Sequence, residues 1–206
     1  MAQQIRGIIL EGQSCSGKTS MFNAIRKQHG LLEDAERNTI FLGEHYSQSL
    51  NYVHDKLVTL TRNENLKVLS DRIEMLENLS EYADNMGVHS KQSRGLFYVF
   101  ERFYINYAFA HNELVGDELL RIEERLISIN PIVVLCTISD SMVESRLRHR
   151  ATYTGEEVTN THIEEYIKTQ KKWIEITEQL RLPVEVINTD QMEWEQYAKR
   201  IMNMMK

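Results

Sequence analysis

A glycine-rich stretch near the amino terminus matches the pattern G-x-x-x-x-G-K-S/T at every position. It consists of Gly12, Gln13, Ser14, Cys15, Ser16, Gly17, Lys18 and Thr19. The glycines allow turns that a Cβ would forbid, so backbone N–H groups can point at phosphate oxygens, and a helix that begins near Gly17 adds its positive end. In this pattern the lysine reaches the terminal phosphates and the threonine hydroxyl binds Mg²⁺. We therefore expect this stretch, with the following Ser20, to bind ATP together with Mg²⁺.

The flanks of this stretch have the strand and helix context that the motif requires. Residues 5–10 form an apolar run that is typical of a buried parallel strand. After the stretch, Met21, Phe22 and Ile25 recur at helical spacing, and Gly30 is suited to end the helix. The alternative is a Gly/Ser turn between two core elements, which explains the glycines but not both flanks.

Further apolar runs alternate with helical patterns, which favours an α/β fold with a parallel sheet. The predicted strands cover residues 5–10, 39–42, 96–100, 132–138 and 184–187. The predicted helices cover residues 47–61, 65–86, a stretch that ends near 129, a segment that starts at 139–141 with Ser141 and Glu144 as a capping box, 161–181 and 192–204. We expect a three-layer fold in which helices flank five parallel strands.

The composition fits one globular domain that spans residues 1–206. The chain is 42% hydrophobic and 26% charged and has only two prolines, so no linker is expected. Its net charge of −6 implies no general affinity for nucleic acid. Cys15 and Cys136 provide neither a disulfide framework nor a metal quartet, which fits a cytoplasmic location. No apolar run has the length of a membrane span or the pattern of a signal peptide.

Polar residues follow several of the predicted strands. In parallel sheets, ligands bind beyond the carboxyl ends of the strands, which singles out Glu44, Glu101, Arg102, Asp140 and residues 188–190. Glu44 could accept a proton from a hydroxyl or bind Mg²⁺ through water; the alternative is a solvated strand end. Glu101 could meet the metal while Arg102 clamps phosphate oxygens; the alternative is a surface ion pair.

Three arginines and a histidine cluster where a predicted helix gives way to a polar loop. They are Arg146, Arg148, His149 and Arg150. Residues 151–157 have no large aliphatic side chain, so we expect a mobile loop there. Phosphoryl transfer requires positive charge on the transferring group and exclusion of water, which a basic lid over about residues 149–161 would supply. Because the arginines spread around the helix, we expect two of them to reach the site. The alternative is a helix end neutralised by cations.

Aromatic residues are concentrated between Phe97 and Phe109. Aromatic rings can sandwich a flat base, but we expect most of these side chains in the core. Tyr104 and Tyr107 are the candidates for contact with a substrate ring.

On these residues the chain resembles the P-loop nucleoside and nucleoside-monophosphate kinases, which include thymidylate kinases and deoxynucleoside kinases. The run from Leu10 to Thr19 is similar to the E-G-x-x-x-S-G-K-T segment of both families, and Glu101-Arg102-Phe103 is similar to their D-R-Y or E-R-S step. Glu44 falls where both families have the glutamate of an E-P step. Residues 146–150 fall in their arginine-rich lid, and residues 188–190 fall near their adenine-contacting loop.

The resemblance implies ATP-dependent transfer of a phosphoryl group to a nucleotide or nucleoside. It gives catalytic roles to Lys18, Glu44, Glu101, Arg102, Arg146 and Arg150. It makes Thr19 and Glu101 metal ligands, and it adds Arg148 and Asp190 to the residues that bind ATP. It also implies that two copies could dimerise through their long helices.

Departures from both families leave the acceptor open. Ser14 stands where thymidylate kinases usually carry an acidic residue, and Glu44-His45-Tyr46-Ser47 replaces their E-P-G-G. Deoxynucleoside kinases usually have a tryptophan soon after that glutamate, and this chain has none there. The alternatives are a P-loop kinase of another small hydroxyl compound and a P-loop ATPase or switch that acts through a partner.

Overall fold

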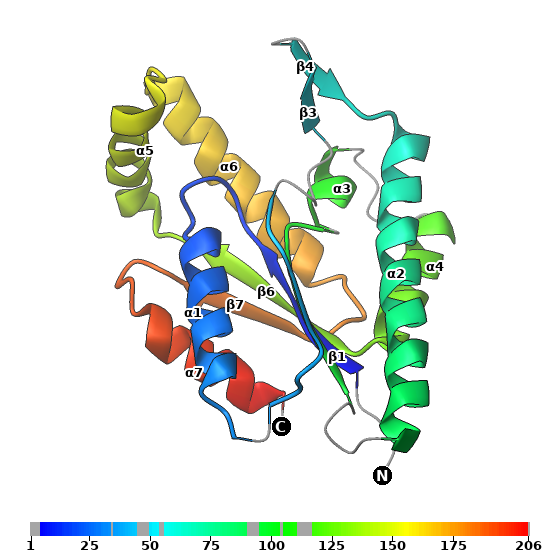
Figure 1. The fold of residues 1–206 in the computed structure, drawn as a ribbon. Helices are drawn as coiled ribbons and strands as arrows, with labels where there is room; N and C mark the ends of the chain where they lie inside the picture. The colour runs from blue at the N-terminus through cyan, green and yellow to red at the C-terminus, as the bar shows by residue number, and fades with distance from the viewer. Residues whose placement is uncertain are drawn as a thin grey trace.

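Strands and helices alternate along most of the chain (Figure 1). The computed structural model describes residues 5–33, 35–44, 50–53, 56–89, 95–103, 105–110 and 117–205. Its strands are β1 (Ile5–Glu11), β2 (Thr39–Leu42), β3 (Leu50–Val53), β4 (Lys56–Thr59), β5 (Leu96–Glu101), β6 (Pro131–Thr137) and β7 (Val184–Asn188). Its helices are α1 (Lys18–Gly30), α2 (Arg62–His89), α3 (Ile105–Ala110), α4 (Asp117–Ser128), α5 (Asp140–Thr154), α6 (Asn160–Thr177) and α7 (Trp194–Met204).

Five strands form one sheet in which every neighbouring pair is parallel. The order is β2-β5-β1-β6-β7, and Ile8 of β1 lies opposite Val99 of β5 and Ile132 of β6. Every residue of β5 and β6 is buried, as expected where helices cover both faces of a sheet. Because the strands point the same way, their carboxyl ends meet at one edge. The five-stranded parallel sheet predicted from the sequence is confirmed.

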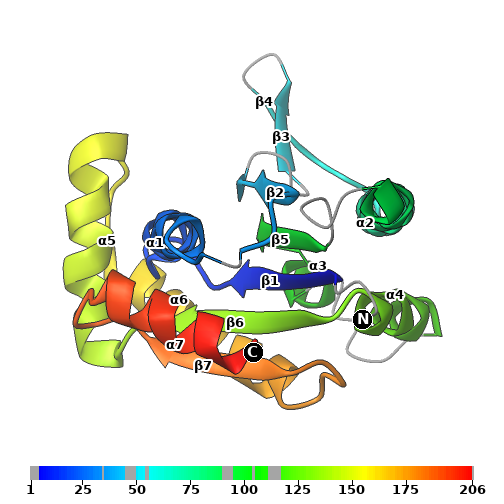
Figure 2. The same cartoon turned by 60° about the horizontal axis from the view of Figure 1, so that its bottom comes forward.

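Helices cover both faces of this sheet (Figures 1 and 2). Side chains of β1 alternate between the two faces. Ile9 joins a core that contains residues of α2, α3, α4 and α6, whereas Ile8 and Leu10 join a core that contains residues of α1 and α7. The molecule therefore has three layers, as predicted. Among the described residues, no helix combines the length and the apolar composition that a membrane crossing requires.

Most of the aromatic side chains between residues 97 and 109 belong to these cores, as expected. The buried ones are Phe97, Tyr98, Phe100, Phe103 and Tyr107. Tyr107, a candidate for contact with a substrate ring, is therefore a core residue, and Tyr104 lies outside the described residues.

The helix predicted over residues 47–61 is wrong where the structure describes it. β3 and β4 pair as an antiparallel hairpin, with Tyr52 opposite Leu57. β-branched and aromatic residues are frequent in this segment, and they favour a strand. The following helix, α2, begins at Arg62, after a capping box: the N–H of Thr61 donates to Glu64 Oε2 at 2.8 Å and the N–H of Glu64 donates to Thr61 Oγ1 at 3.4 Å.

The start of α5 lies where the sequence predicted it, but the predicted cap is not formed. The helix begins at Asp140, and its N-cap Ser139 makes no side-chain capping hydrogen bond. Glu144 pairs with Arg148 one turn later instead of reaching back to Ser141. The predicted capping box is therefore wrong, because the N-cap is Ser139 and Ser141 already lies in the first turn of the helix. The i,i+4 ion pair engages the glutamate instead.

The connection between α5 and α6 is shorter than the lid predicted from the sequence. α5 continues to Thr154 and stops at Gly155, whose φ of 72° suits a glycine. Residues 151–154 are therefore helical, and the connection to α6 comprises only residues 155–159. α6 ends at Thr177 rather than at the predicted residue 181.

Candidate active site

The glycine-rich stretch forms the loop between β1 and α1, as predicted. Gly12 has a φ of 140° and Gly17 a φ of 86°, both in the region that favours glycine. A Cβ at Gly12 would lie 2.6 Å from the carbonyl oxygen of Cys136, so the loop approaches β6 too closely for a side chain there. α1 starts at Lys18, directly after the loop. Its positive N-terminal end therefore faces the space where an anion would bind.

Two side chains, one of them from the loop itself, tie the loop to distant parts of the chain. Gln13 Nε2 donates to the carbonyl oxygen of Tyr166 in α6 at 2.7 Å. Just beyond β7, the hydroxyl of Thr189 lies 2.9 Å from the carbonyl oxygen of Ser16 and 3.1 Å from that of Thr137. The loop is therefore tied both to α6 and to the segment that follows β7.

Lys18 supplies a buried cation at the loop. Its residue is 4% exposed, and Nζ donates to the carbonyl oxygen of Gln13 at 2.8 Å. Burial, followed by the charge of Arg102, lowers the pKa of Lys18 to about 8. A nearby anion favours the charged form of a lysine. A phosphate in the loop would thus offset both causes of the lowered pKa.

Thr19 and Glu101, the predicted metal ligands, lie in contact. Thr19 Oγ1 donates to Glu101 Oε1 at 2.6 Å, and Glu101 is buried. Among the described residues, no group of three His, Cys, Asp or Glu side chains could hold a metal ion. One hydroxyl and one carboxylate nevertheless fit Mg²⁺, which keeps several waters and is bound through one or two carboxylates and substrate phosphates.

Glu44 and Arg102 form an ion pair beyond the carboxyl ends of β2 and β5. Arg102 Nε lies 2.7 Å from Glu44 Oε1. Arg102 has a φ of 65°, which is uncommon for a residue with a Cβ, and its N–H donates to the carbonyl oxygen of Leu10 at 2.8 Å. Glu101 therefore meets Thr19 while its neighbour Arg102 meets Glu44, so the two side chains have different partners. The metal and phosphate roles of this pair stay predictions.

Glu11, to which the sequence assigned no role, organises the segment after β5. Its carboxylate is fully buried, and Oε1 accepts hydrogen bonds from the N–H groups of Phe103 and Ile105, both at 3.0 Å. Arg72 of α2 is also buried, with its guanidinium 5.5 Å from the ring centroid of Phe103. Burial lowers the pKa of Arg72 to about 10, and the charge of Glu11 acts against that lowering. A glutamate at the end of an apolar strand was the available sequence signal.

A cavity of about 610 Å³ opens beside the loop, a volume typical of small-molecule sites. The loop and the start of α1 contribute Ser14, Cys15, Gly17, Lys18, Thr19 and Ser20. The remaining wall consists of Glu44, Met142, Ser145, Arg146, His149, Arg150, Met192 and Trp194.

The cavity includes some of the predicted site residues and not others. The predicted residues outside its wall, all within the described ranges, are Gly12, Gln13, Ser16, Glu101, Arg102, Asp140, Arg148 and residues 188–190. The wall residues that the sequence did not suggest are Met142, Ser145, Met192 and Trp194. They come from helices and a loop that local patterns cannot place beside the phosphate loop.

Arg146 and Arg148 of α5 have different surroundings. Arg146 lies in the cavity wall, and its Nη2 donates to the carbonyl oxygen of Thr189 at 2.8 Å. Arg148 pairs with Glu144 at 2.8 Å, and both side chains are more than half exposed. The predicted contact of Arg148 with ATP has no support from this position.

Arg150 reaches from α5 to the loop. It lies in the cavity wall beside Cys15. Burial raises the pKa of the Cys15 thiol, whereas the charge and hydrogen bond of Arg150 and the charge of Lys18 act in the opposite direction. Two of the three arginines therefore face the cavity, the number expected from their spacing.

Asp190 has a structural partner. Its Oδ1 accepts a hydrogen bond from the N–H of Ser139 at 3.0 Å, and its own N–H donates to Asn188 Oδ1 at 2.9 Å. In the segment that follows β7, Met192 and Trp194 line the cavity instead. Asp190 does not line the cavity, so its predicted role in binding ATP has no support from this position.

Comparison with solved structures shows that this chain has the fold of the P-loop kinases. The YorR protein from Bacillus subtilis, solved in complex with phosphorylated GDP, has a TM-score of 0.63 at 16% identity, over 96% of this chain and 94% of that one. Thymidylate kinase from Candida albicans has a TM-score of 0.54 at 12% identity, over 99% and 92% of the two chains.

Shikimate kinase from Acinetobacter baumannii, in complex with shikimate, has a TM-score of 0.52 at 14% identity, over 98% of this chain and 93% of that one. No protein-family model and no curated protein matches the sequence. The resemblance expected from the sequence is thus confirmed at the level of the fold.

Proposed function

We propose that this protein transfers the terminal phosphoryl group of ATP, with Mg²⁺, to a nucleotide or nucleoside. The observation that carries the proposal is the meeting of Lys18, Thr19 and Arg150 in the wall of one cavity. A phosphate-binding loop alone would serve a switch or an ATPase equally well. Arg150 of α5 adds a cation beside the loop. This arrangement suits transfer of a phosphoryl group, because negative charge that develops on the group then meets a positive partner.

On the donor side, the loop N–H groups and Lys18 would bind the phosphates. Thr19 and Glu101 would hold Mg²⁺, which when bound neutralises charge on the phosphate oxygens. Arg150 would lie against the transferring group. Arg146 is tied to Thr189, which favours a positioning role over the catalytic role predicted for it.

On the acceptor side, Glu44 and Arg102 are the proposed partners. As the acceptor oxygen bonds to the terminal phosphorus, the bond from phosphorus to ADP breaks. If the acceptor is a hydroxyl, its proton passes to Glu44; if it is a phosphate, no strong base is needed and Glu44 keeps Arg102 in place. The ion pair between them at 2.7 Å supports either use. The cytoplasmic location and the homodimer stay predictions.

The proposal is tested by a thermal-shift screen of nucleosides, nucleoside monophosphates, sugars and hydroxy acids, each with Mg²⁺ and a non-hydrolysable ATP analogue. Binding stabilises the folded state by mass action, so we expect a nucleoside or monophosphate to raise Tm selectively. The selected compound should then be phosphorylated in the presence of ATP. Lys18→Met, which keeps the length of the side chain, should lower turnover by about 10³-fold while the protein stays folded.

Other outcomes contradict separate parts of the proposal. Selective stabilisation by a sugar or a hydroxy acid would refute the nucleotide or nucleoside acceptor. ATP hydrolysis at the same rate with and without every acceptor would point to a switch or ATPase. Turnover near that of the wild type in Lys18→Met would refute the role of the loop.

A further inference from the structure

A buried hydroxyl near the phosphate loop has no hydrogen-bond partner in the part of the chain that the structure describes. It belongs to Tyr166 of α6, a residue that is 6% exposed. Burying a hydroxyl without a partner costs free energy, and most buried polar groups in proteins are hydrogen-bonded. The proposed function gives this hydroxyl no role. It therefore marks a place where a bound group can supply the missing partner.

The side chain of Tyr166 lies against α5 and close to the loop. It packs in a cluster with residues of α5 and with Ile138, which follows β6. The carbonyl oxygen of Tyr166 accepts the hydrogen bond from Gln13 of the loop. Cys15 and Arg146, which line the cavity, both act on the hydroxyl electrostatically. The hydroxyl thus lies behind the part of the cavity wall that these two residues form.

Two cations act on this hydroxyl from different parts of the fold. They are Arg102, which follows β5, and Arg146 of α5. Burial raises the pKa of the Tyr166 hydroxyl, the thiol of Cys15 acts in the same direction, and the charge of Arg146 acts against it. The hydroxyl therefore keeps its proton at neutral pH and is available as a donor. A donor beside two guanidinium groups suits an anionic oxygen.

Arg146 contributes a second donor without a partner. Its Nη2 donates to the carbonyl oxygen of Thr189 at 2.8 Å, but its Nε is buried and makes no hydrogen bond to a described residue. Helices α5 and α6 are in contact, so an N–H and an O–H from neighbouring helices both lack an acceptor beside the phosphate loop. An oxygen of a bound phosphate is the acceptor that such a loop brings to this place.

We propose that Tyr166 recognises the terminal phosphoryl group of ATP: its hydroxyl donates a hydrogen bond to an oxygen of that group and so distinguishes a triphosphate from a diphosphate. This inference rests on the proposed function, because it presumes that the loop binds ATP. The terminal phosphate is the partner because Arg102, on the proposed acceptor side, acts on the same hydroxyl. A change of side-chain rotamer at Cys15 or Arg146 opens the hydroxyl to the cavity.

Tyr166→Phe tests this contact, because it removes the hydroxyl and keeps both the ring and the carbonyl oxygen that holds Gln13. Calorimetry with Mg²⁺ and either the β,γ-imido analogue of ATP or ADP compares ligands with and without a terminal phosphate. We expect the variant to bind the analogue about tenfold more weakly than the wild type, as for loss of a hydrogen bond to a charged group. Its affinity for ADP should not change.

Tyr98→Phe is the matched control. Tyr98 of β5 is also buried, but its hydroxyl donates to the carbonyl oxygen of Ile129, which precedes β6, at 3.2 Å. Losing a satisfied hydrogen bond destabilises a protein, whereas losing a hydroxyl without a partner does not. We therefore expect Tyr98→Phe to lower the Tm of the unliganded protein and to leave both affinities unchanged. Tyr166→Phe should keep that Tm or raise it.

The outcomes distinguish this inference from the proposed function. If Tyr166→Phe binds the analogue and ADP as the wild type does, the role of Tyr166 is refuted and the function stands. If it weakens ADP as much as the analogue, the hydroxyl supports the loop rather than the terminal phosphate, and the inference is again refuted. A fall in Tm as large as that of Tyr98→Phe would refute it too, because the hydroxyl would then have a partner in the free protein. If neither ligand binds the wild type, the proposed function fails as well.

Discussion

The arginines of α5 differ in what their side chains meet, although they alternate along a short stretch of one helix. Arg150 lies beside Cys15 of the phosphate loop, whereas Arg148 is held by Glu144 at the surface. Surface ion pairs of this kind contribute little to stability. The two residues therefore form a matched pair: the same chemical group, two positions apart, inside and outside the candidate site.

Arg150→Ala should lower kcat by about 10³-fold, by analogy with other arginines that stabilise a transferring phosphoryl group. Arg148→Ala should leave kcat close to that of the wild type, because its guanidinium meets no group of the cavity wall. Steady-state turnover of both variants with saturating ATP and acceptor checks this. An equal loss in the two variants would mean that α5 contributes general positive charge rather than a specific contact.

The segment between β5 and α3 illustrates how an element is held in place by a residue from another strand. Glu11, at the end of β1, accepts hydrogen bonds from the N–H groups of Phe103 and Ile105. Glu101, the last residue of β5, and Arg102, which follows it, meet Thr19 and Glu44. The buried charge of Arg72 lies on the α2 side of this arrangement. The position of the candidate catalytic pair thus depends on a carboxylate that meets neither nucleotide nor acceptor in the proposed mechanism.

Glu11→Gln should keep an oxygen that accepts both N–H groups but remove the charge that faces Arg72. We expect it to lower the free energy of unfolding, because a buried charge without its partner is costly. Arg72→Met in the Glu11→Gln background should recover part of the loss, with a coupling of about 1–3 kcal/mol in a double-mutant cycle. Denaturant unfolding of the four proteins measures it. Strictly additive effects would show that the two charges do not interact.

The same elements show what a sequence can predict. The phosphate loop and the five parallel strands were predicted correctly, because each is encoded by a short local pattern. The hairpin of β3 and β4 was mistaken for a helix, since its apolar residues also fit a helical period over so short a segment. The contact between Gly17 and Trp194 joins residues far apart in the sequence, so no local pattern indicates it. The partners of Arg146, Arg148 and Arg150 depend on the direction of each side chain. Their spacing predicted that two of the three reach the site, but not which two.

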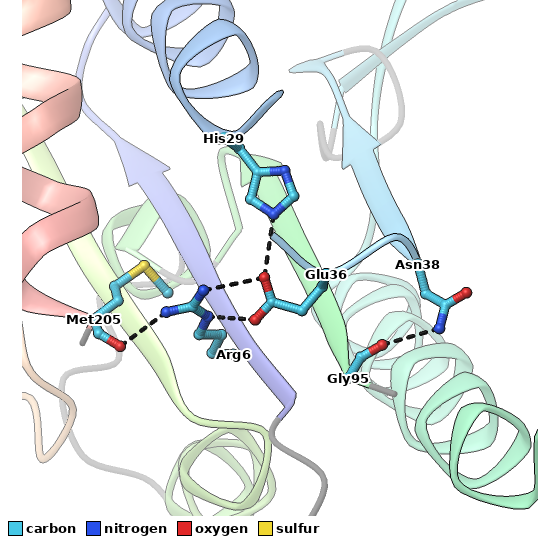
Figure 3. A network of polar contacts seen from close by, with 6 residues as sticks. All are labelled: Arg6, His29, Glu36, Asn38, Gly95 and Met205. Atoms are coloured by element: carbon cyan, nitrogen blue, oxygen red, sulfur yellow. Dashed lines mark hydrogen bonds and ion pairs between the residues drawn. The ribbon is translucent and has the colours of Figure 1, made fainter. Parts of the chain in front are cut away.

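At the scale of the whole molecule, the candidate site and a network of structural polar contacts lie at opposite ends of the sheet. The cavity lies at the carboxyl ends of the strands, whereas a polar network near the start of β1 joins distant parts of the chain (Figure 3). Arg6 of β1 donates to both carboxylate oxygens of Glu36 and to the carbonyl oxygen of Met205 after α7. His29 of α1 lies 3.2 Å from the same carboxylate and stacks on Phe97 of β5. The network therefore links β1, α1 and the C-terminal segment.

Glu36 should make the stability of the protein depend on pH in the acid range without affecting catalysis. Burial acts to raise the pKa of this carboxyl, but hydrogen bonds from His29 and Arg6 outweigh it and lower the pKa to about 2, from an ordinary value of 4.5. The unfolded chain therefore binds more protons between these values, so the stabilisation is present above pH 4.5 and is lost as the pH falls toward 2. Glu36→Gln should lower Tm at neutral pH, and its difference from the wild type should shrink over that window.

Glu195→Gln is the control for this prediction, because Glu195 also pairs with a cation but its side chain is 64% exposed. It should change Tm little at any pH. Kinetics at neutral pH complete the test: kcat and the Michaelis constant for ATP should be those of the wild type in Glu36→Gln, since the network lies away from the cavity. A Tm difference for Glu36→Gln that stays constant with pH would show that the carboxylate charge is not what stabilises the network. A changed kcat would mean that the two ends of the sheet are coupled.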